Sequence, residues 1–180
     1  MKAIEKLLHY LGIMTAFVLA ALVLLIVYDA LVRYLFSGGS IALQELEWHL
    51  FDVVILLGIA YALKEGAHVR VDIFYTSFSH KTKALVNMIA SLFFILPFSL
   101  LLIYLGVDFV ALSFAQNEAS SNPGGLEHRF LVKSLLPLAF VFVSLQTLRD
   151  FKEQYQIFRD PNLALDLEKN SSYEAGENSL

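Results

Sequence analysis

The stretch that decides the fold is residues 41–75, IALQELEWHLFDVVILLGIAYALKEGAHVRVDIFY. Its purely apolar part, residues 53–63, is too short for a bilayer, because a helix rising ~1.5 Å per residue needs ~20 residues to cross ~30 Å of hydrocarbon. A spanning helix must therefore begin near residue 41 and take its acidic start into the membrane. Charges are costly there, so we expect Glu45 and Asp52 to face protein, water or headgroups rather than lipid tails.

The composition of the whole chain indicates a membrane protein. Of its 180 residues, 57% are hydrophobic and the mean hydropathy is +0.63, against roughly 45–50% apolar residues in soluble domains. The chain has no cysteine, which excludes disulfides, cysteine-ligated metals and thiol catalysis. We predict an all-α integral membrane protein with four transmembrane helices joined by short amphipathic segments.

The long apolar blocks define the predicted domain, residues 1–148. Its four spans are expected at about residues 8–31, 41–63, 84–112 and 130–148. The first block is longer than the apolar core of a signal peptide and no small-residue cleavage site follows it, so we interpret it as a retained anchor. Residues 149–180 are expected to form a tail that begins as a helix and becomes disordered after Pro161, because its end is polar and acidic.

The distribution of lysine and arginine predicts the orientation. Ten of these residues fall in the N-terminus, the second loop and the C-terminal tail, whereas three fall on the opposite side, namely Arg33, Arg129 and Lys133. Positive residues are enriched on the cytoplasmic side. We therefore expect both termini in the cytoplasm, with the protein in the bacterial inner (cytoplasmic) membrane.

Polar residues at the start of the second span are the first candidate site. Glu45, His49 and Asp52 recur at helical spacing and share a face. They are interpreted as a proton or cation relay, as a patch that together with Trp48 contacts another subunit, or as partners of an intrachain cation such as Arg33. The subunit contact is the preferred interpretation.

Two further charge patterns lie at the same, outer end of the predicted bundle. Asp29 and Arg33 are spaced i, i+4, so they are expected to pair with each other or to reach the start of the second span. Arg129 and Lys133 open the fourth span one helical turn apart and predict a small anion-attracting site. Its expected occupant is a lipid headgroup, an external partner protein or another subunit.

The cytoplasmic loop after the second span contains the alternating string of residues 69–73, VRVDI, preceded by His68. Such alternation predicts an amphipathic segment along the membrane surface, with His68, Arg70 and Asp72 as contact residues. Two possible metal ligands are weak support for a metal site. In the third span, Pro97 predicts a kink, because proline lacks a backbone donor.

Several short motifs resemble the small membrane subunit (DctQ type, or Q subunit) of tripartite ATP-independent periplasmic (TRAP) transporters. The resemblance covers about residues 7–148, and its motifs keep their order over four spans. They are Arg33-Tyr34-Leu35-Phe36, Gln44-Glu45-Leu46, Leu50-Phe51, Gly58 with Ala60-Tyr61-Ala62-Leu63, His68-Val69-Arg70-Val71-Asp72, and Gly124-Gly125-Leu126 with Arg129, Lys133 and Pro137.

The resemblance implies a function without catalysis, cofactor or metal. It implies a small scaffold subunit that supports a large, elevator-type membrane subunit, in which sodium coupling is expected, and that helps to dock a periplasmic substrate-binding protein for a small organic anion. Its partners would be those two proteins and membrane lipids, with no nucleic acid. The alternatives are a self-contained four-span transporter and the membrane anchor of a redox enzyme.

Overall fold

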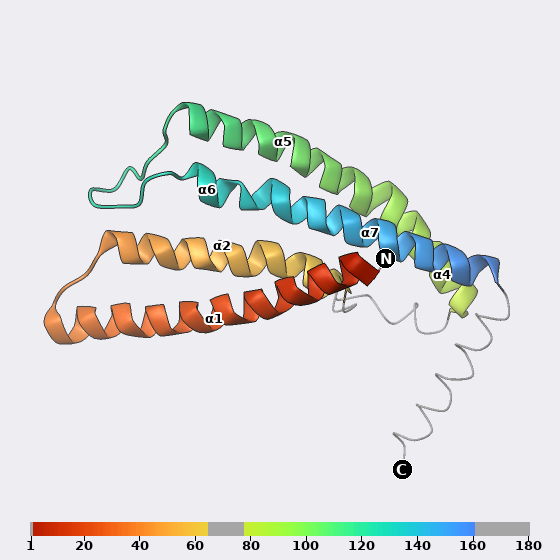
Figure 1. Cartoon of the computed structure of the whole chain (residues 1–180), viewed down its shortest axis with the longest axis horizontal. Coiled ribbons are helices and arrows are strands. Elements are labelled where there is room, and N and C mark those ends of the chain that lie inside the picture. Colours follow the sequence, from red (N-terminus) through yellow and green to blue (C-terminus); the bar gives the residue numbers. More distant parts are fainter. Residues whose placement is uncertain (1, 65–77, 161–180) are drawn as a thin grey trace, which may run out of the picture. The chain divides into compact units, whose positions relative to one another are not determined.

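The computed structural model describes residues 2–64 and 78–160. Every regular element among these residues is a helix (Figure 1). The elements are α1 (Lys2–Phe36), α2 (Ile41–Lys64), α4 (His80–Ala90), a π-helical turn η1 (Ser91–Ile95), α5 (Leu96–Ala115), α6 (Phe130–Lys133) and α7 (Leu135–Arg159). The all-α prediction is confirmed for the described residues.

Four of the helical stretches are long and apolar enough to cross a membrane, as predicted. They are Ile4–Phe36, Ile41–Lys64, His80–Ala115 and Phe130–Arg159. Each helix reaches further than its predicted apolar block, and α7 continues to Arg159. Hydropathy marks only the part of a helix that suits lipid, whereas the polar residues 149–159 are mostly good helix formers and prolong the helix.

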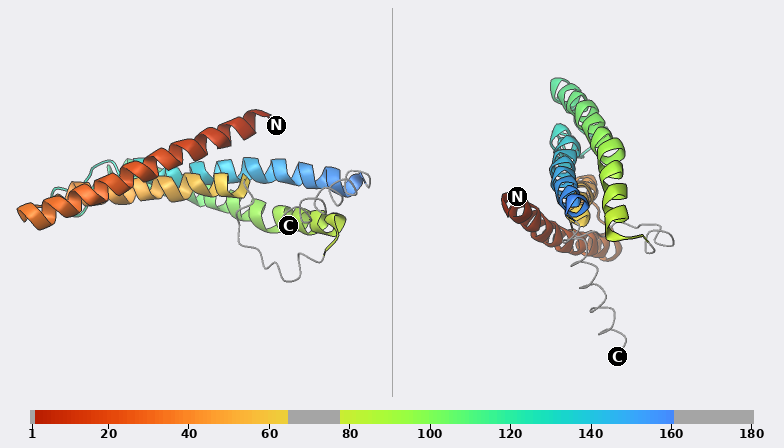
Figure 2. Two further views of the ribbon diagram at one scale, coloured as in Figure 1. Left: turned by 90° about the horizontal axis from the view of Figure 1, so that it is seen from below. Right: turned by 90° about the vertical axis from the view of Figure 1, so that its right-hand side faces the viewer.

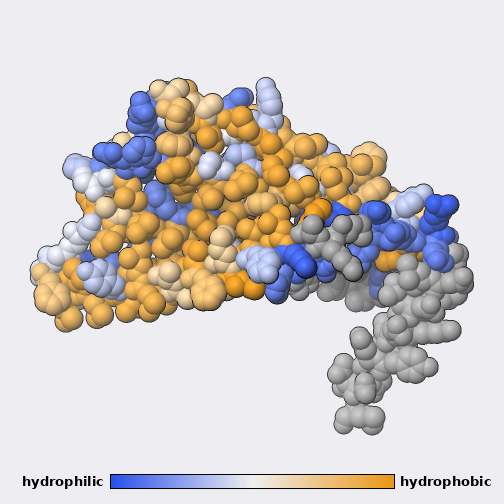
Figure 3. Space-filling model, viewed as in Figure 1, coloured by the Kyte–Doolittle hydropathy of each residue, from blue (hydrophilic) through white to orange (hydrophobic). Residues whose placement is uncertain are grey.

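Large apolar side chains cover the outside of these helices. At most 22% of the residues in the apolar window of any candidate span are buried within the chain. Figure 3 shows hydrophobic side chains over most of the visible helical surface, with hydrophilic ones gathered mainly towards helix ends. Such a surface suits lipid or other membrane helices, because soluble monomers rarely expose contiguous apolar patches of this extent.

The described residues group into two compact units. The first contains the described parts of residues 1–67 and 99–143, and the second contains those of 68–98 and 144–180. The boundary between the units falls inside α5 and inside α7.

In the first unit, α1 and α2 form an antiparallel hairpin (Figure 1). The hairpin turns at Ser37, which has a positive φ of 51°, and Ser40 precedes α2 and accepts a 3.4 Å hydrogen bond from the Leu43 backbone N–H. A Cβ on Gly12 would lie 2.5 Å from the ring of Tyr61. Glycine at position 12 therefore allows α1 and the aromatic ring on α2 to meet closely.

Within the first unit α5 also packs against the start of α7. A Cβ on Gly106 would lie 3.1 Å from Cδ of Pro137. Ser99 and Ser113 are buried at seven-residue spacing on either side of Gly106, so small side chains line this face of α5. Pro137 also explains the break between α6 and α7 at Ser134, because its ring lacks an N–H for the carbonyl four residues earlier.

The irregularity predicted at Pro97 takes the form of a π-helical turn. Residues Ser91–Ile95 form this turn immediately before the proline, and the Leu96 N–H donates to the Ser91 carbonyl. Figure 2 shows α4, this turn and α5 following one another along one continuous helical path. The wider turn is one of the known ways in which a helix accommodates a residue that interrupts its hydrogen bonds.

The second unit contains α4 and the larger part of α7. Asn87 Nδ2 lies 3.4 Å from Gln154 Oε1, and Lys81 Nζ lies 5.2 Å from the centroid of the Phe158 ring. These contacts pair polar side chains of α4 with the polar continuation of α7 beyond its apolar part. The amphipathic segment predicted at residues 69–73 and the disorder predicted after Pro161 lie outside the described residues.

Candidate functional site

The carboxylate of Glu45 is the centre of the most connected polar cluster in the first unit. Glu45 is 5% exposed although it belongs to a helix of membrane-spanning type. Its carboxylate accepts hydrogen bonds from the Ser120 hydroxyl, from Asn122 Nδ2 at 3.2 Å and from the Leu126 backbone N–H at 2.7 Å, and Arg129 lies 3.6 Å away. We call these five residues the Glu45 network.

The loop between α5 and α6, residues 116–129, is folded around this carboxylate. Its two sides are joined by backbone hydrogen bonds from Ser120 N–H to the Leu126 carbonyl at 2.9 Å and from Arg129 N–H to the Glu118 carbonyl at 3.0 Å. A Cβ on Gly125 would lie 2.7 Å from Oε2 of Glu45. Backbone amides and a glycine thus let the loop approach a charge that would otherwise be costly to bury.

The two cations at the start of the fourth span each have an acid partner within the chain. Arg129 faces Glu45, and Lys133 forms a salt bridge with Glu118 while its Nζ lies 4.1 Å from the centroid of the Phe109 ring. The predicted open anion-attracting site is therefore corrected to two intrachain ion pairs. The sequence argument considered only the i, i+4 spacing of the cations and missed the acids that the folded loop brings to them.

Glu118 belongs to the loop rather than to a membrane-spanning helix. The hydrogen bond from Lys133 is the main cause that lowers the pKa of the Glu118 carboxyl below its ordinary value. A lowered pKa means that the ionised carboxylate is favoured in the folded chain. The salt bridge therefore holds the loop to the start of the fourth span at neutral pH.

The predicted pairing of Asp29 with Arg33 is present. Asp29 is 3% exposed, and the side chain of Arg33 is 49% exposed. The second expected possibility, in which Arg33 reaches the acids of the second span, does not occur for Glu45, whose cation is Arg129.

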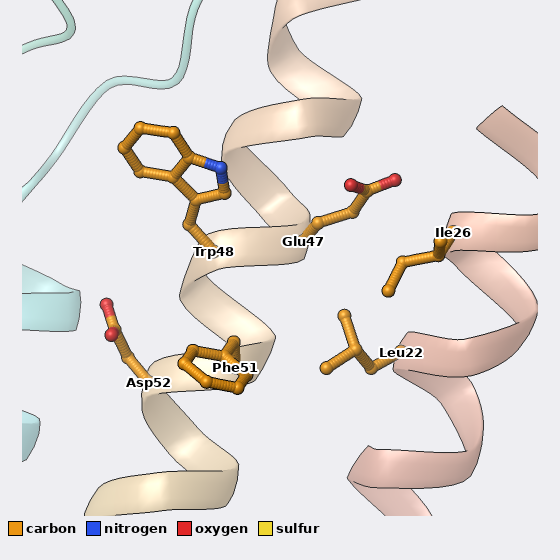
Figure 4. Close-up of a pocket in the computed structure, with 6 residues that line it drawn as sticks. All are labelled: Leu22, Ile26, Glu47, Trp48, Phe51 and Asp52. Carbon is orange, nitrogen blue, oxygen red and sulfur yellow. The ribbon is translucent and has the colours of Figure 1, made fainter. Parts of the chain in front are cut away.

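Trp48 and Asp52 are among the residues of α1 and α2 that line a groove. The groove has a volume of about 420 Å³. We call it the α1/α2 groove; its lining residues are Leu22, Ile26, Glu47, Trp48, Phe51 and Asp52 (Figure 4). Trp48 is 69% exposed and Phe51 is 55% exposed, so aromatic surface is open at this site.

The sequence argument missed Glu47. Its Oε1 atom is buried and has no hydrogen-bond partner among the residues that the structure describes. In Figure 4 its side chain extends towards Ile26 of α1, whereas Trp48 and Asp52 extend to the other side of α2. Helical spacing grouped Glu45 with His49 and Asp52, and it gave no reason to single out an acid on the neighbouring face.

Three of the sequence-predicted contact residues, His68, Arg70 and Asp72, lie outside the described residues. Within residues 2–64 and 78–160, no group of three or more histidine, aspartate or glutamate side chains is arranged to hold a metal ion. The ion pairs at this end of the first unit are instead Asp29 with Arg33, Glu45 with Arg129 and Glu118 with Lys133.

Comparison with known proteins identifies the family. The chain matches the family model described as tripartite ATP-independent periplasmic transporters, DctQ component, over residues 22–156. It is also 24% identical over 155 residues to a Haemophilus influenzae protein that is provisionally named a TRAP transporter small permease protein, with 84% of this chain and 90% of the relative covered. Because the model spans three quarters of the chain, the protein belongs to the DctQ family of TRAP transporter small permeases, as a multi-pass transporter subunit and not an enzyme.

Proposed function

We propose that this chain is the fixed scaffold subunit of a sodium-coupled TRAP transporter for a small organic anion. In this proposal it supports a large, elevator-type membrane subunit that carries the substrate and the sodium ions. It lies in the bacterial inner membrane with both termini in the cytoplasm, and it contributes part of the surface on which a periplasmic substrate-binding protein docks.

The observation that carries the scaffold role is the long uncharged stretch that each span contains. Residues 11–28, 53–63, 84–107 and 134–148 contain no aspartate, glutamate, lysine, arginine or histidine. Residues that move ions or protons through a membrane are ionisable groups inside the spans. A chain with few such groups is suited to form a fixed helical wall while another subunit provides the pathway.

The docking role is supported by the Glu45 network. A loop held by a buried carboxylate, three hydrogen bonds and an arginine presents one defined backbone conformation. Preorganised surfaces lose less conformational entropy when a partner binds. Under the proposed orientation this loop faces the periplasm, where a soluble binding protein has access to it.

Reconstitution into liposomes tests the division of labour. The chain alone, the large subunit alone and both together are reconstituted, and uptake of the substrate delivered by the binding protein is measured with and without an inward sodium gradient. We expect sodium-dependent uptake only when both subunits are present. Uptake by this chain alone would contradict the scaffold role and favour a self-contained transporter.

Reporter fusions test the orientation separately. A reporter that is active only in the cytoplasm, fused after Lys83 or after Leu180, should be active, and the same reporter near Ser121 should be inactive. The reverse pattern would refute the assignment of sides from the positive residues.

A further inference from the structure

At the end of the first unit that contains the loop of residues 116–129, there are more acidic residues than lysines and arginines to pair with them. The three cations at this end are already committed: Arg33 to Asp29, Arg129 to Glu45 and Lys133 to Glu118. Glu47 and Asp52 line the α1/α2 groove, and neither has an ion-pair partner among the residues that the structure describes. No further lysine or arginine lies among the described residues of this end, so a positive charge for this groove has to come from outside them.

The position of the groove makes an unpaired carboxylate costly. Glu47 and Asp52 belong to α2, a helix long and apolar enough to cross a membrane. Ionisable groups within such helices are found paired with one another or facing protein or water. A donor group on a partner would satisfy the buried Oε1 of Glu47, which lacks a donor among the described residues.

The lining of the groove indicates which kind of donor fits. Phe51 lines the groove one helical turn after Glu47, whereas Trp48 extends with Asp52 to the other side of α2 (Figure 4). Arginine combines a permanent charge, a planar fork that matches a carboxylate and a surface that stacks on aromatic rings. A groove that offers carboxylates and aromatic faces together is best matched by a guanidinium.

The depth of the groove favours a transmembrane helix over a lipid headgroup as the carrier of this charge. Glu47 and Asp52 lie six and eleven residues after Ile41, which is about 9 Å and about 17 Å along the helix. A lipid amine stays near the level of the headgroups, whereas a side chain from a neighbouring helix reaches both levels. The apolar residues Leu22 and Ile26 complete a wall against which such a helix can pack.

We propose that the α1/α2 groove receives a basic side chain, best matched by arginine, from a transmembrane helix of the large TRAP subunit, and that this side chain pairs with Glu47. The inference rests on the proposed function, because it requires the large subunit as a partner. It adds the location of the contact, the residue that makes it and the chemistry of the partner residue.

Copurification of the full-length chain with its large subunit tests the pairing. Tagged wild type and Glu47→Gln are coexpressed with the large subunit, extracted in mild detergent and quantified for the large subunit retained. We expect Glu47→Gln to retain at least about tenfold less, because removing one member of a buried interfacial charge pair leaves the other uncompensated. The matched control is Glu127→Gln, an exposed acid of the same end, which should retain the wild-type amount.

A photo-crosslinking amino acid at Phe51 identifies the occupant of the groove. The crosslink should map to a transmembrane helix of the large subunit, within one helical turn of an arginine or lysine. Reversing that residue to glutamate together with Glu47→Arg should restore copurification. Crosslinks only to lipid or to a second copy of this chain, or the absence of a basic residue near the crosslink, would overturn the inference.

The two levels of the proposal fail in different ways. Wild-type chain that copurifies with no large subunit would refute the proposed function, and this inference with it. A wild-type complex that survives Glu47→Gln unchanged would overturn only the pairing and leave the scaffold role standing.

Discussion

The Glu45 network and the α1/α2 groove use the same helix and the same type of residue in opposite ways. Glu45 has three hydrogen-bond donors and an arginine around it, all from its own chain. Glu47, two residues further along α2, has a buried oxygen without a partner among the described residues. Buried polar groups are nearly always satisfied in complete structures. The Glu45 network is therefore a structural element complete within the chain, whereas the α1/α2 groove is, in our proposal, a surface that another protein completes.

The largest effect is expected when the Glu45 network is disrupted. Glu45→Ala removes the acceptor for Ser120, Asn122 and the Leu126 amide. A buried donor left without an acceptor costs about 1–3 kcal/mol, so we expect the Leu126 amide to exchange with solvent on the order of 100-fold faster. Hydrogen exchange with mass spectrometry on the purified chain in detergent measures this. Unchanged protection of residues 118–129 would mean that backbone bonds alone hold the loop.

A smaller effect is expected from Gly125→Ala, which tests the close approach of the loop to the carboxylate. The new Cβ would press against the Ser120 side chain and would lie 2.7 Å from Oε2 of Glu45, and forced overpacking typically costs about 1–3 kcal/mol. We expect roughly tenfold faster exchange in the loop. Gly39→Ala is the matched control, because nothing lies within 4 Å of its Cβ. Equal behaviour of the two variants would contradict the role assigned to Gly125.

The sequence predicts those features of the structure that depend on residues close together in the chain. Apolar blocks and i, i+4 spacing are local, so the four helices and the Asp29–Arg33 pair are predicted correctly. The partners of Glu45 lie 75 to 84 residues away, on a loop whose glycine, proline and asparagine content indicates only a turn. The periodicity of the sequence therefore does not predict which carboxylate such a loop will cover.

The same limit explains the misjudged cations. The spacing of Arg129 and Lys133 correctly indicates that they lie on neighbouring turns, and from this the anion site was inferred. The result depends on whether acids distant in sequence approach them, and Glu45 and Glu118 do. Two like charges on one helix face therefore predict acidic partners as readily as they predict an open site for an external anion.

The same substitution, glutamate to glutamine, at positions 45 and 47 tests in the isolated chain whether each acid has a partner within the chain. Glu45→Gln keeps one acceptor oxygen but loses the charge opposite Arg129, so the loop should exchange faster than in wild type. Glu47→Gln removes a charge that has no partner within the described chain, so thermal stability should be unchanged or raised by up to about 1 kcal/mol. Measurement of both variants without the large subunit separates internal from interfacial roles. Destabilisation by Glu47→Gln in isolation would show that this acid has an internal partner.

The smallest expected effect is a pH dependence at the Lys133–Glu118 salt bridge. Because the pKa of Glu118 is lowered in the folded chain by the hydrogen bond from Lys133, its stabilisation is complete above the unfolded value of about 4.3 and is lost as the pH falls through the lower folded value. The unfolding temperatures of wild type and Lys133→Met should therefore differ slightly at pH 7 and converge once the pH falls below the folded pKa of Glu118. Both side chains are partly exposed, Lys133 to 18% and Glu118 to 29%, and ion pairs in contact with solvent contribute little, so the difference should be smaller than that of either loop variant. A difference that persists in acid would assign the role of Lys133 to its contact with the Phe109 ring, which does not titrate, and would leave the Glu45 network as the main electrostatic support of the loop.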